Sequence, residues 1–257
     1  MLLVIDSGNT NVVFAVYDGE EKRGQWRASS DSRRTPDEYA VWLTQLLSLD
    51  GIAPSEIDGA IISNVVPAAQ RNLRVLCQRY FKVEPLVVEE RSISYGVPIR
   101  LDRPEQIGAD RIANAVGAYA RYGGPLIVVD FGTATTFDVI GEDGGYDGGV
   151  IAPGINLSMD ALYSAAARLP RIAVEKPQRV IGTDTVSAMQ SGVFWGYVGL
   201  IEGLIERIQA EYGGDLTVVG TGGLAPLFSE TTAVIQESDA DMTLRGLVLL
   251  YQRNSEA

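Results

Sequence analysis

The sequence predicts an α/β protein built from two similar halves. Runs of apolar β-forming residues alternate with helical segments along the whole chain, which is the order expected when helices cover a sheet. A polar turn follows an apolar strand at residues 4–10, "VIDSGNT", and a similar turn recurs at residues 128–136, "VVDFGTATT". Two such turns at half-chain spacing indicate an internal duplication. We therefore expect two lobes with a cleft between them.

The first half begins with a predicted hairpin, because the polar turn "DSGNTN" joins two apolar strands. A helix follows, with a proline in its first turn and a closing glycine. The predicted elements are strands at 2–5 and 12–17, a helix at 35–51, a strand at 57–67, a helix at 68–81 and a strand at 84–90.

The second half repeats this alternation. We expect a helix at 108–123, a strand, turn and strand at 125–145, a Gly/Pro turn and helix at 148–169, a long helical stretch at 183–214, a strand with a glycine turn at 215–228 and a terminal helix at 242–254. Aligning the two turns pairs Asp6 with Asp130, Gly8 with Gly132, Asn9 with Thr133 and Val12 with Thr136. No Ser/Gly-rich linker separates the halves, and the expected lobes are residues 1–115 and 116–257.

Composition excludes several classes of function. The chain has 257 residues, of which 46% are hydrophobic, so it can bury a substantial core. Its formal net charge of -12 argues against binding nucleic acid, which requires a basic face. No segment has the roughly 18 consecutive apolar residues that span a bilayer, so we expect no membrane association and a cytoplasmic location.

The chain has no histidine and one cysteine, Cys77. An internal disulfide is therefore excluded, as are a Ser/His or Cys/His nucleophile and a histidine-containing metal site. Acid–base chemistry must use Asp, Glu, Lys, Tyr or the substrate itself. We expect Cys77 to be a packed residue of a helix.

The repeated turn suits phosphate binding. An aspartate at the end of a buried strand offers a carboxylate to a metal, and the following glycine lets backbone N–H groups approach a phosphate. A single Asp-x-Gly turn is more often only a hairpin. Two copies, with a third glycine-rich strand end at 218–223, "VVGTGG", favour a nucleotide clamp.

These three turns carry a resemblance to a known superfamily. "DSGNTN", "DFGTATTFD" and "GTGGL" are similar to the phosphate-1, phosphate-2 and adenosine motifs of the acetate and sugar kinases, Hsp70 and actin. The resemblance implies two duplicated RNase H-like lobes, that is, the actin-like ATPase fold.

Three further motifs resemble one family within that superfamily. "GADR" (108–111), "FGTATTFDVI" (131–140) and "GGVIAPGI" (148–155) closely resemble the type III pantothenate kinases, and the similarity runs over nearly the whole chain. It implies ATP-dependent phosphorylation of pantothenate to 4'-phosphopantothenate, the first step of coenzyme A biosynthesis.

The resemblance assigns substrate residues in "GADR". Asp110 matches the family's proton acceptor, and a carboxylate suffices for that role because the proton leaves late in a loose transition state. Arg111 has a planar donor fork suited to the pantothenate carboxylate. Gly108 and Ala109 are expected to line the same pocket. Without the resemblance, the sequence predicts that Asp110 and Arg111 are surface residues at the start of a helix, where the helix dipole favours an aspartate.

The resemblance also assigns the nucleotide and ion sites. Asp6 is expected to hold Mg²⁺ through water, and Asp130 a monovalent cation, K⁺ or NH₄⁺; hard oxygen ligands suit both ions. The residues expected to bind ATP are Asp6, Ser7, Gly8, Asn9, Thr10, Asn11, Val12, Val13, Thr133, Gly222 and Gly223.

Thr185 matches a residue that reaches pantothenate from the neighbouring subunit, so the resemblance implies a homodimer with the substrate pocket at the interface. The apolar run at 193–205 suits either that interface or a core helix. The chain departs from its relatives at Leu101, where they commonly carry tyrosine, and at Thr183 and Asp184, where they often carry lysine and asparagine.

The sequence leaves two alternative functions open. One is a related small-molecule kinase acting on another carboxylated alcohol, which Arg111 would still select. The other is a non-catalytic ATP-binding transcription accessory factor, for which a degenerate site is expected. Asp6, Asp110 and Asp130 are all present, which favours an enzyme.

Overall fold

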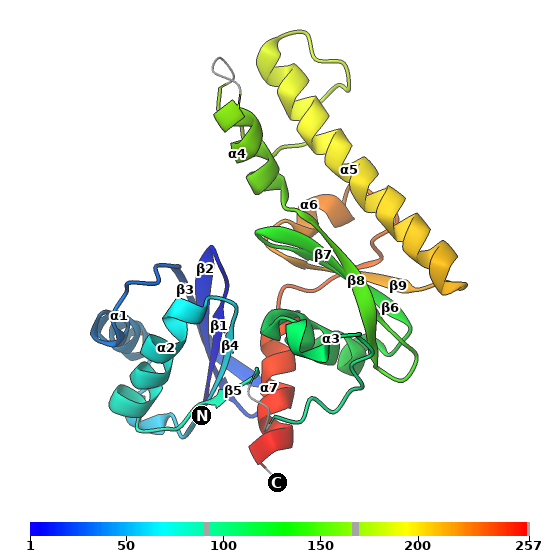
Figure 1. The fold of residues 1–257 in the computed structure, drawn as a ribbon. Coiled ribbons are helices and arrows are strands. Elements are labelled where there is room, and N and C mark those ends of the chain that lie inside the picture. The colour runs from blue at the N-terminus through cyan, green and yellow to red at the C-terminus, as the bar shows by residue number, and fades with distance from the viewer. Residues whose placement is uncertain (90–92, 166–169, 256–257) are drawn as a thin grey trace. The chain divides into compact units, whose positions relative to one another are not determined.

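The computed structural model describes residues 1–89, 93–165 and 170–255 (Figure 1). The chain forms two compact units, one made of residues 1–122 with the segment that starts at Asp241, the other of residues 123–240. The predicted lobe boundary after residue 115 falls inside helix α3 (Ala109–Tyr122), so the observed division comes seven residues later, where the helix ends. The terminal segment was expected in the second lobe and belongs to the first unit.

The first unit contains a five-stranded sheet with the order β3-β2-β1-β4-β5. Its strands are β1 (Leu2–Ser7), β2 (Asn11–Asp18), β3 (Glu21–Ser29), β4 (Gly59–Asn64) and β5 (Leu86–Val87). Strand β1 is antiparallel to β2 and parallel to β4. The carboxyl ends of β1 and β4 therefore lie side by side.

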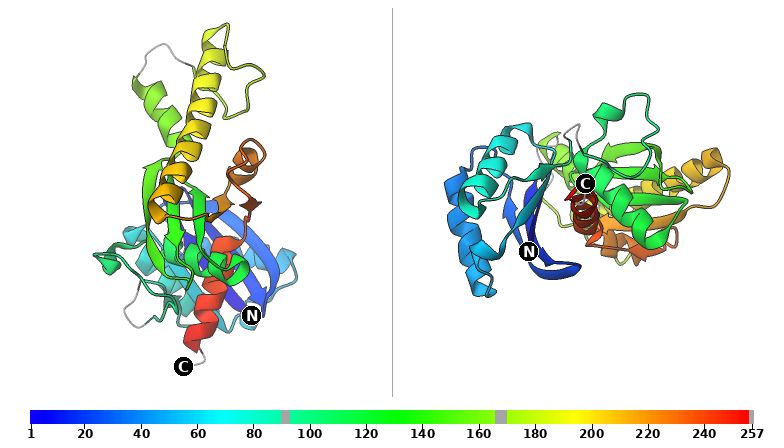
Figure 2. Two further views of the ribbon diagram at one scale, coloured as in Figure 1. Left: turned by 90° about the vertical axis from the view of Figure 1, so that its right-hand side faces the viewer. Right: turned by 90° about the horizontal axis from the view of Figure 1, so that it is seen from below.

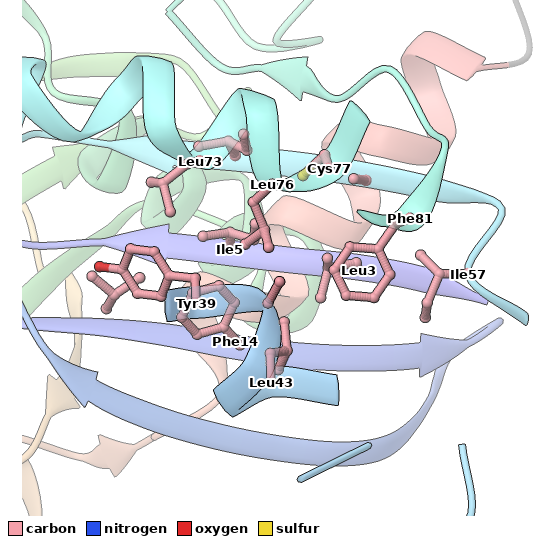
Figure 3. Packing of buried hydrophobic residues seen from close by; sticks show 14 of the residues in the cluster. Leu3, Ile5, Phe14, Tyr39, Leu43, Ile57, Leu73, Leu76, Cys77 and Phe81 are labelled. Carbon is pink, nitrogen blue, oxygen red and sulfur yellow. The ribbon is translucent and has the colours of Figure 1, made fainter. Parts of the chain in front are cut away.

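Helices pack on both faces of this sheet. They are α1 (Pro36–Leu49), α2 (Gln70–Leu76), the π-helical turn η3 (Cys77–Phe81) that continues α2, α3, and α7 (Met242–Ser255), with short 3-10 turns η1 (Pro54–Glu56), η2 (Pro67–Ala69) and η4 (Pro104–Gln106). Leu3 and Ile5 of β1 pack in one core cluster with residues of α1 and α2 (Figure 3). Because side chains alternate along a strand, Val4 and Asp6 lie on the opposite face. Helix α7 contacts β1 and β4 and lies side by side with α3 (Figure 2).

The second unit contains a sheet with the order β10-β9-β6-β7-β8. Its elements are β6 (Leu126–Phe131), β7 (Ala134–Ile140), β8 (Tyr146–Pro153), α4 (Ile155–Ala165), α5 (Thr185–Tyr212), β9 (Thr217–Gly222), α6 (Ala225–Ser229) and β10 (Glu237–Ser238). One face of α5 is buried, and its Phe194, Ile201 and Ile205 share a core cluster with Ile127 and Phe137 of the sheet. The core-helix interpretation of 193–205 therefore holds for this face.

The two sheets have the same topology, which confirms the predicted duplication. Strands β1 to β5 correspond to β6 to β10, with the same neighbours and directions. The turns differ in length: Ser7 pairs with Val12 in the first, and Phe131 with Thr135 in the second. The alignment of Val12 with Thr136 is wrong, because the second turn is one residue shorter.

Three strands of the structure were not predicted. Strand β3 carries mostly exposed polar side chains, β8 contains two glycines in its middle, and β10 has only two residues. All three are edge strands, which pair on one side only and need no continuous apolar pattern. The predicted strand at 84–90 is shorter in the structure, and its last residue lies outside the described part, as do residues 166–169 of the predicted helix at 148–169.

Within the described residues, we find no helix that is both long and apolar enough to cross a membrane.

Candidate active site

Asp6 lies at the carboxyl end of β1, on the face of the sheet opposite the cluster of α1 and α2. It is half-buried, and its register partner on the parallel strand β4 is Ser63. The Ser63 hydroxyl donates a hydrogen bond to Asp6 Oδ1 at 2.9 Å. The carboxylate is thereby held in one orientation at the strand end.

The charge on Asp6 is destabilised by its surroundings. Burial raises the pKa of Asp6 to about 6, and the negative charge of Asp110 contributes to that increase. The Ser63 hydrogen bond and the positive charge of Arg27 act in the opposite direction. A bound cation would offset both unfavourable effects, so Asp6 fits the role of a metal-holding carboxylate.

Hydrogen bonds within the turn and from Ser30 stabilise the turn after Asp6. The Gly8 amide donates to the Asn11 carbonyl at 3.0 Å, and the Ser30 amide donates to the Thr10 carbonyl at 2.9 Å. The Ser30 hydroxyl donates to the Gly8 carbonyl. These hydrogen bonds engage the carbonyl groups of the turn. Residues 9 and 10, at the tip of the turn, are exposed to solvent.

Asp110 lies in the first turn of α3. The Arg111 amide donates to Asp110 Oδ1 at 2.8 Å. A Cβ added at Gly108 would come within 2.6 Å of the same oxygen, so glycine leaves room for this carboxylate orientation. Burial raises the pKa of Asp110, although the Arg111 amide and the Arg111 charge lower it in part. Ala109 is buried beside it.

The structure brings further groups to this part of the first unit. Burial, followed by the charge of Asp110, raises the pKa of Glu89, and burial and the charge of Glu89 raise that of Tyr95. Ser63, Arg27 and Glu89 were not predicted as site residues from the sequence. Ser63 and Glu89 each follow a short apolar run, which is the signal that marked Asp6; Arg27 offered none.

In the second unit, Asp130 occupies the position that corresponds to Asp6. Gly222 at the end of the neighbouring strand β9 has φ of +89°, and a Cβ there would lie 2.7 Å from the Phe131 carbonyl oxygen and 2.8 Å from Asp130 Oδ1. Only glycine fits this approach. A Cβ on Gly223 would meet nothing within 4 Å, so the next residue borders open space.

The turn after Asp130 is also closed by backbone hydrogen bonds. The Gly132 amide donates to the Ala134 carbonyl at 3.0 Å, and the Gly154 amide donates to the Thr133 carbonyl at 3.1 Å. Thr133 itself is exposed. Asp130, Thr133, Gly222 and the exposed Gly223 thus gather at the carboxyl ends of β6 and β9.

Thr185 is the first residue of α5 and is exposed. Asp184 caps this helix: its carboxylate accepts from the Ser187 amide at 2.9 Å, and this bond lowers the pKa of Asp184. Asp184 therefore has a local structural role. The N-terminal end of α5 projects away from the sheet of its own unit (Figure 1), so the structure does not bring Thr185 to Asp130.

No group of three or more His, Cys, Asp or Glu residues that could hold a metal ion occurs in the described part of the chain. An ion at Asp6 or Asp130 would need oxygen ligands from elsewhere, and phosphate, water, hydroxyl and carbonyl oxygens suit Mg²⁺ and K⁺. Asp6 and Asp130 are each a single, half-buried carboxylate at a strand end, which fits an ion whose other oxygen ligands come from substrate or water.

Two duplicated sheets, each with an aspartate and a glycine turn at the carboxyl end of its first strand, define an actin-like ATPase fold. Solved structures agree. The chain matches a protein from Campylobacter jejuni described as a Baf family transcriptional activator (TM-score 0.62, 20% identity, 99% of this chain and 100% of that chain). It also matches the activator of 2-hydroxyisocaproyl-CoA dehydratase from Clostridium difficile (TM-score 0.58, 12% identity, 99% and 96%).

Sequence comparison identifies the family. The family model of type III pantothenate kinase matches residues 2–207. The chain is 63% identical to the type III pantothenate kinase of Paramagnetospirillum magneticum and 62% identical to that of Phenylobacterium zucineum, in each case over 99% of this chain and 98% of the relative. The chain belongs to the type III pantothenate kinase family.

Proposed function

We propose that this protein transfers the γ-phosphoryl group of ATP to the primary hydroxyl of pantothenate, giving 4'-phosphopantothenate, the first step of coenzyme A biosynthesis. One observation of the structure supports it above all: Asp6 and Asp110 belong to the same unit, near enough for the charge of Asp110 to raise the pKa of Asp6. A metal-holding carboxylate and a proton-accepting carboxylate are the two acidic roles that phosphoryl transfer to an alcohol requires.

Asp110 accepts the proton of the attacking hydroxyl. Its Oδ1 is engaged by the Arg111 amide, which fixes the carboxylate and leaves its other oxygen for the substrate. The raised pKa of Asp110 makes it a stronger base than a solvated aspartate, because the pKa of the base lies closer to that of the group it deprotonates.

Arg111 binds the carboxylate of pantothenate, and Gly108 and Ala109 line the pocket beside it. The guanidinium offers parallel donors that match a carboxylate in two-point contact. This interaction selects acids among alcohol substrates and orients the hydroxyl toward Asp110.

ATP binds through three groups of residues. Residues 6–13 surround the phosphates, with Asn9 supplying a donor; Thr133 contacts the nucleotide; and Gly222 and Gly223 leave backbone accessible to the adenosine. Asp6 would hold Mg²⁺ through water, and the bound ion would neutralise charge on the phosphate oxygens. Asp130 would hold a monovalent cation, K⁺ or NH₄⁺.

The protein acts as a cytoplasmic homodimer in which Thr185 reaches the pantothenate of the partner subunit. Exposed apolar side chains on and near α4 and the start of α5 support this proposal, since clusters of this kind mark protein interfaces. These residues are Leu157, Leu162, Tyr163, Val180, Ile181 and Val186. The face of α5 that was also considered for this role is largely buried in the core of its own unit.

An ATP-consumption assay tests the proposed function. Purified protein with Mg²⁺ is measured with and without pantothenate, in K⁺ and in Na⁺, beside Asp110→Asn and the exposed control Glu105→Gln. We expect turnover that requires pantothenate and K⁺, falls at least about a hundredfold in Asp110→Asn and is unchanged in the control. Pantothenate-independent turnover, or full activity in Asp110→Asn, would reject the proposal.

The two alternatives give different results in the same assay. A kinase for another carboxylated alcohol binds ATP and turns over with a different acid. An ATP-binding accessory factor, the role suggested by the description of the Campylobacter jejuni structure, binds ATP and turns over with none. The presence of Asp6, Asp110 and Asp130 favours the enzyme.

A further inference from the structure

The row of side chains around Asp130 contains two hydroxyl groups. Asp130 of β6 pairs with Thr221 on the parallel strand β9 and with Thr136 on the antiparallel strand β7. Residues directly opposite one another in a sheet project from the same face, with their Cβ atoms about 5 Å apart. The carboxylate of Asp130 therefore lies between two threonines on one face of the sheet.

The sheet of the first unit lacks one of these two hydroxyl groups. At the position of Thr136 it has Val13, the register partner of Asp6, and at the position of Asp138 it has Ala15, the register partner of Val4. The same sheet topology thus forms with an apolar pair, Val13 and Ala15, in the first unit and with a polar pair, Thr136 and Asp138, in the second. The sheet itself thus does not require Thr136 and Asp138 to be polar.

In the second copy, the polar pair belongs to a buried hydrogen-bonded chain. Asp138 is fully buried. The Tyr146 hydroxyl donates to Asp138 Oδ1 at 2.6 Å, and the Thr136 hydroxyl donates to Asp138 Oδ2 at 3.1 Å. Tyr146 is also buried, whereas Thr136 is half-buried. Burying such groups has a free-energy cost even when they are hydrogen-bonded, and the apolar first copy avoids it.

The direction of these bonds determines what Thr136 can do. A threonine hydroxyl has one proton and two acceptor lone pairs. Because that proton is donated to Asp138, the Thr136 oxygen can offer only lone pairs to its other neighbours. Its register partner Asp130 carries a carboxylate, which also only accepts. Two acceptor oxygens on adjacent strands are brought into favourable contact by a cation between them.

We propose that Thr136 is an oxygen ligand of the monovalent cation alongside Asp130, and that Asp138 and Tyr146 are positioning residues that orient its lone pairs toward the ion. This proposal rests on the proposed function, which places that cation at Asp130. It adds a ligand and its supporting hydrogen bonds, and it explains why only the copy with the monovalent site has the polar pair.

The test uses the full-length protein and K⁺ itself as the probe. K⁺ is titrated against Na⁺ at constant ionic strength, and two readouts are recorded: the K⁺-dependent rise in Tm without substrates, and the turnover of pantothenate. The variants are Thr136→Val, which keeps the shape and removes the oxygen, Thr136→Ser, which restores it, Tyr146→Phe, and the exposed control Thr217→Val.

We expect the half-saturating K⁺ concentration to rise at least about tenfold in Thr136→Val and about tenfold in Tyr146→Phe, as for ligands and their supporting partners at other metal sites. Thr136→Ser and Thr217→Val should match the wild type. A purely structural role would lower Tm equally in K⁺ and Na⁺ and leave half-saturation unchanged, which would overturn the proposal.

If Thr136→Val does not fold, Tyr146→Phe decides the question by the same criterion. Failure of the proposed function is distinguishable, because the wild type would then show no pantothenate turnover in either salt. A wild type that turns over pantothenate without any effect of K⁺ overturns the cation site and this inference while leaving the kinase activity intact.

Discussion

Gly117 of α3 and Gly246 of α7 face each other where the two helices cross. A Cβ placed on Gly117 would lie 3.0 Å from the Gly246 nitrogen, and a Cβ placed on Gly246 would overlap the Ala113 carbonyl oxygen. The helix that carries Asp110 is therefore positioned by direct backbone contact with α7. The two glycines set the distance between these helices.

Gly246→Ala should unfold or severely loosen the first unit. The added methyl group overlaps backbone atoms that cannot rotate away, so we expect a loss of about 3 kcal/mol or more in the free energy of unfolding. Gly199→Ala in α5 is the matched control, because a Cβ there meets nothing within 4 Å. It should be neutral or stabilising by up to about 1 kcal/mol. Urea denaturation followed by circular dichroism measures both; equal stabilities would contradict the close crossing.

Gly222→Ala and Gly223→Ala should separate folding from nucleotide binding. The first places a Cβ against the Phe131 carbonyl and the Asp130 carboxylate at a positive φ, so it should lower stability by about 1–3 kcal/mol. The second fits into open space and should leave Tm unchanged while weakening ATP binding severalfold, because the methyl group keeps the nucleotide from the backbone. Calorimetric titration with ATP and a melting curve of each variant test this. A Gly223→Ala protein with wild-type affinity would show that the nucleotide does not approach this turn.

Asp6→Asn should make the metal-free protein more stable at neutral pH. The folded-state pKa of about 6 lies above the ordinary value of 3.8, so the folded protein binds the Asp6 proton more tightly than the unfolded chain. The stability contributed by neutral Asp6 is complete below pH 3.8 and is lost as the pH rises through about 6. Asparagine stays neutral and still accepts from Ser63.

The expected gain is on the order of 2 kcal/mol at pH 7.5 and narrows as the pH falls toward 4. Denaturation curves without Mg²⁺ at several pH values measure it, with the exposed Asp215→Asn as control. The same variant should lose activity and Mg²⁺-dependent stabilisation by ATP. A variant less stable than the wild type at pH 7.5 would contradict the origin of the raised pKa.

Gly108→Ala should impair catalysis without unfolding the protein. The new Cβ approaches Asp110 Oδ1, the flexible end of a side chain that can rotate, so the stability loss should stay below about 1 kcal/mol. Rotation takes the carboxylate away from the Arg111 amide, and a displaced base should reduce kcat about tenfold or more. ATP affinity should not change. Gly214→Ala, where a Cβ meets nothing, is the control, and an unimpaired Gly108→Ala would mean that the orientation of Asp110 is not critical.

The main features of the fold were readable from the sequence because they depend on local patterns. The repeated Asp-x-Gly turn predicted Asp6 and Asp130 as site residues, whereas Asp110 was predicted through the family resemblance of "GADR". The hydroxyl partner of Asp6 was not predictable in the same way. Ser63 reaches Asp6 only because β1 and β4 pair in one register, and that register is a tertiary property. Strands β3 and β8 were not predicted for a different reason: each lies at the edge of its sheet, and an edge strand needs no apolar pattern.

The position of α7 also bears on how the chain folds as it is synthesised. Helices α3 and α7 contact each other closely, yet the whole of the second unit, residues 123–240, emerges from the ribosome between them. The second unit is continuous and can fold as soon as it is released. The first unit, although begun earlier, must wait with an uncovered α3 until α7 arrives, so a ribosome stalled before residue 242 would expose the helix that carries Asp110.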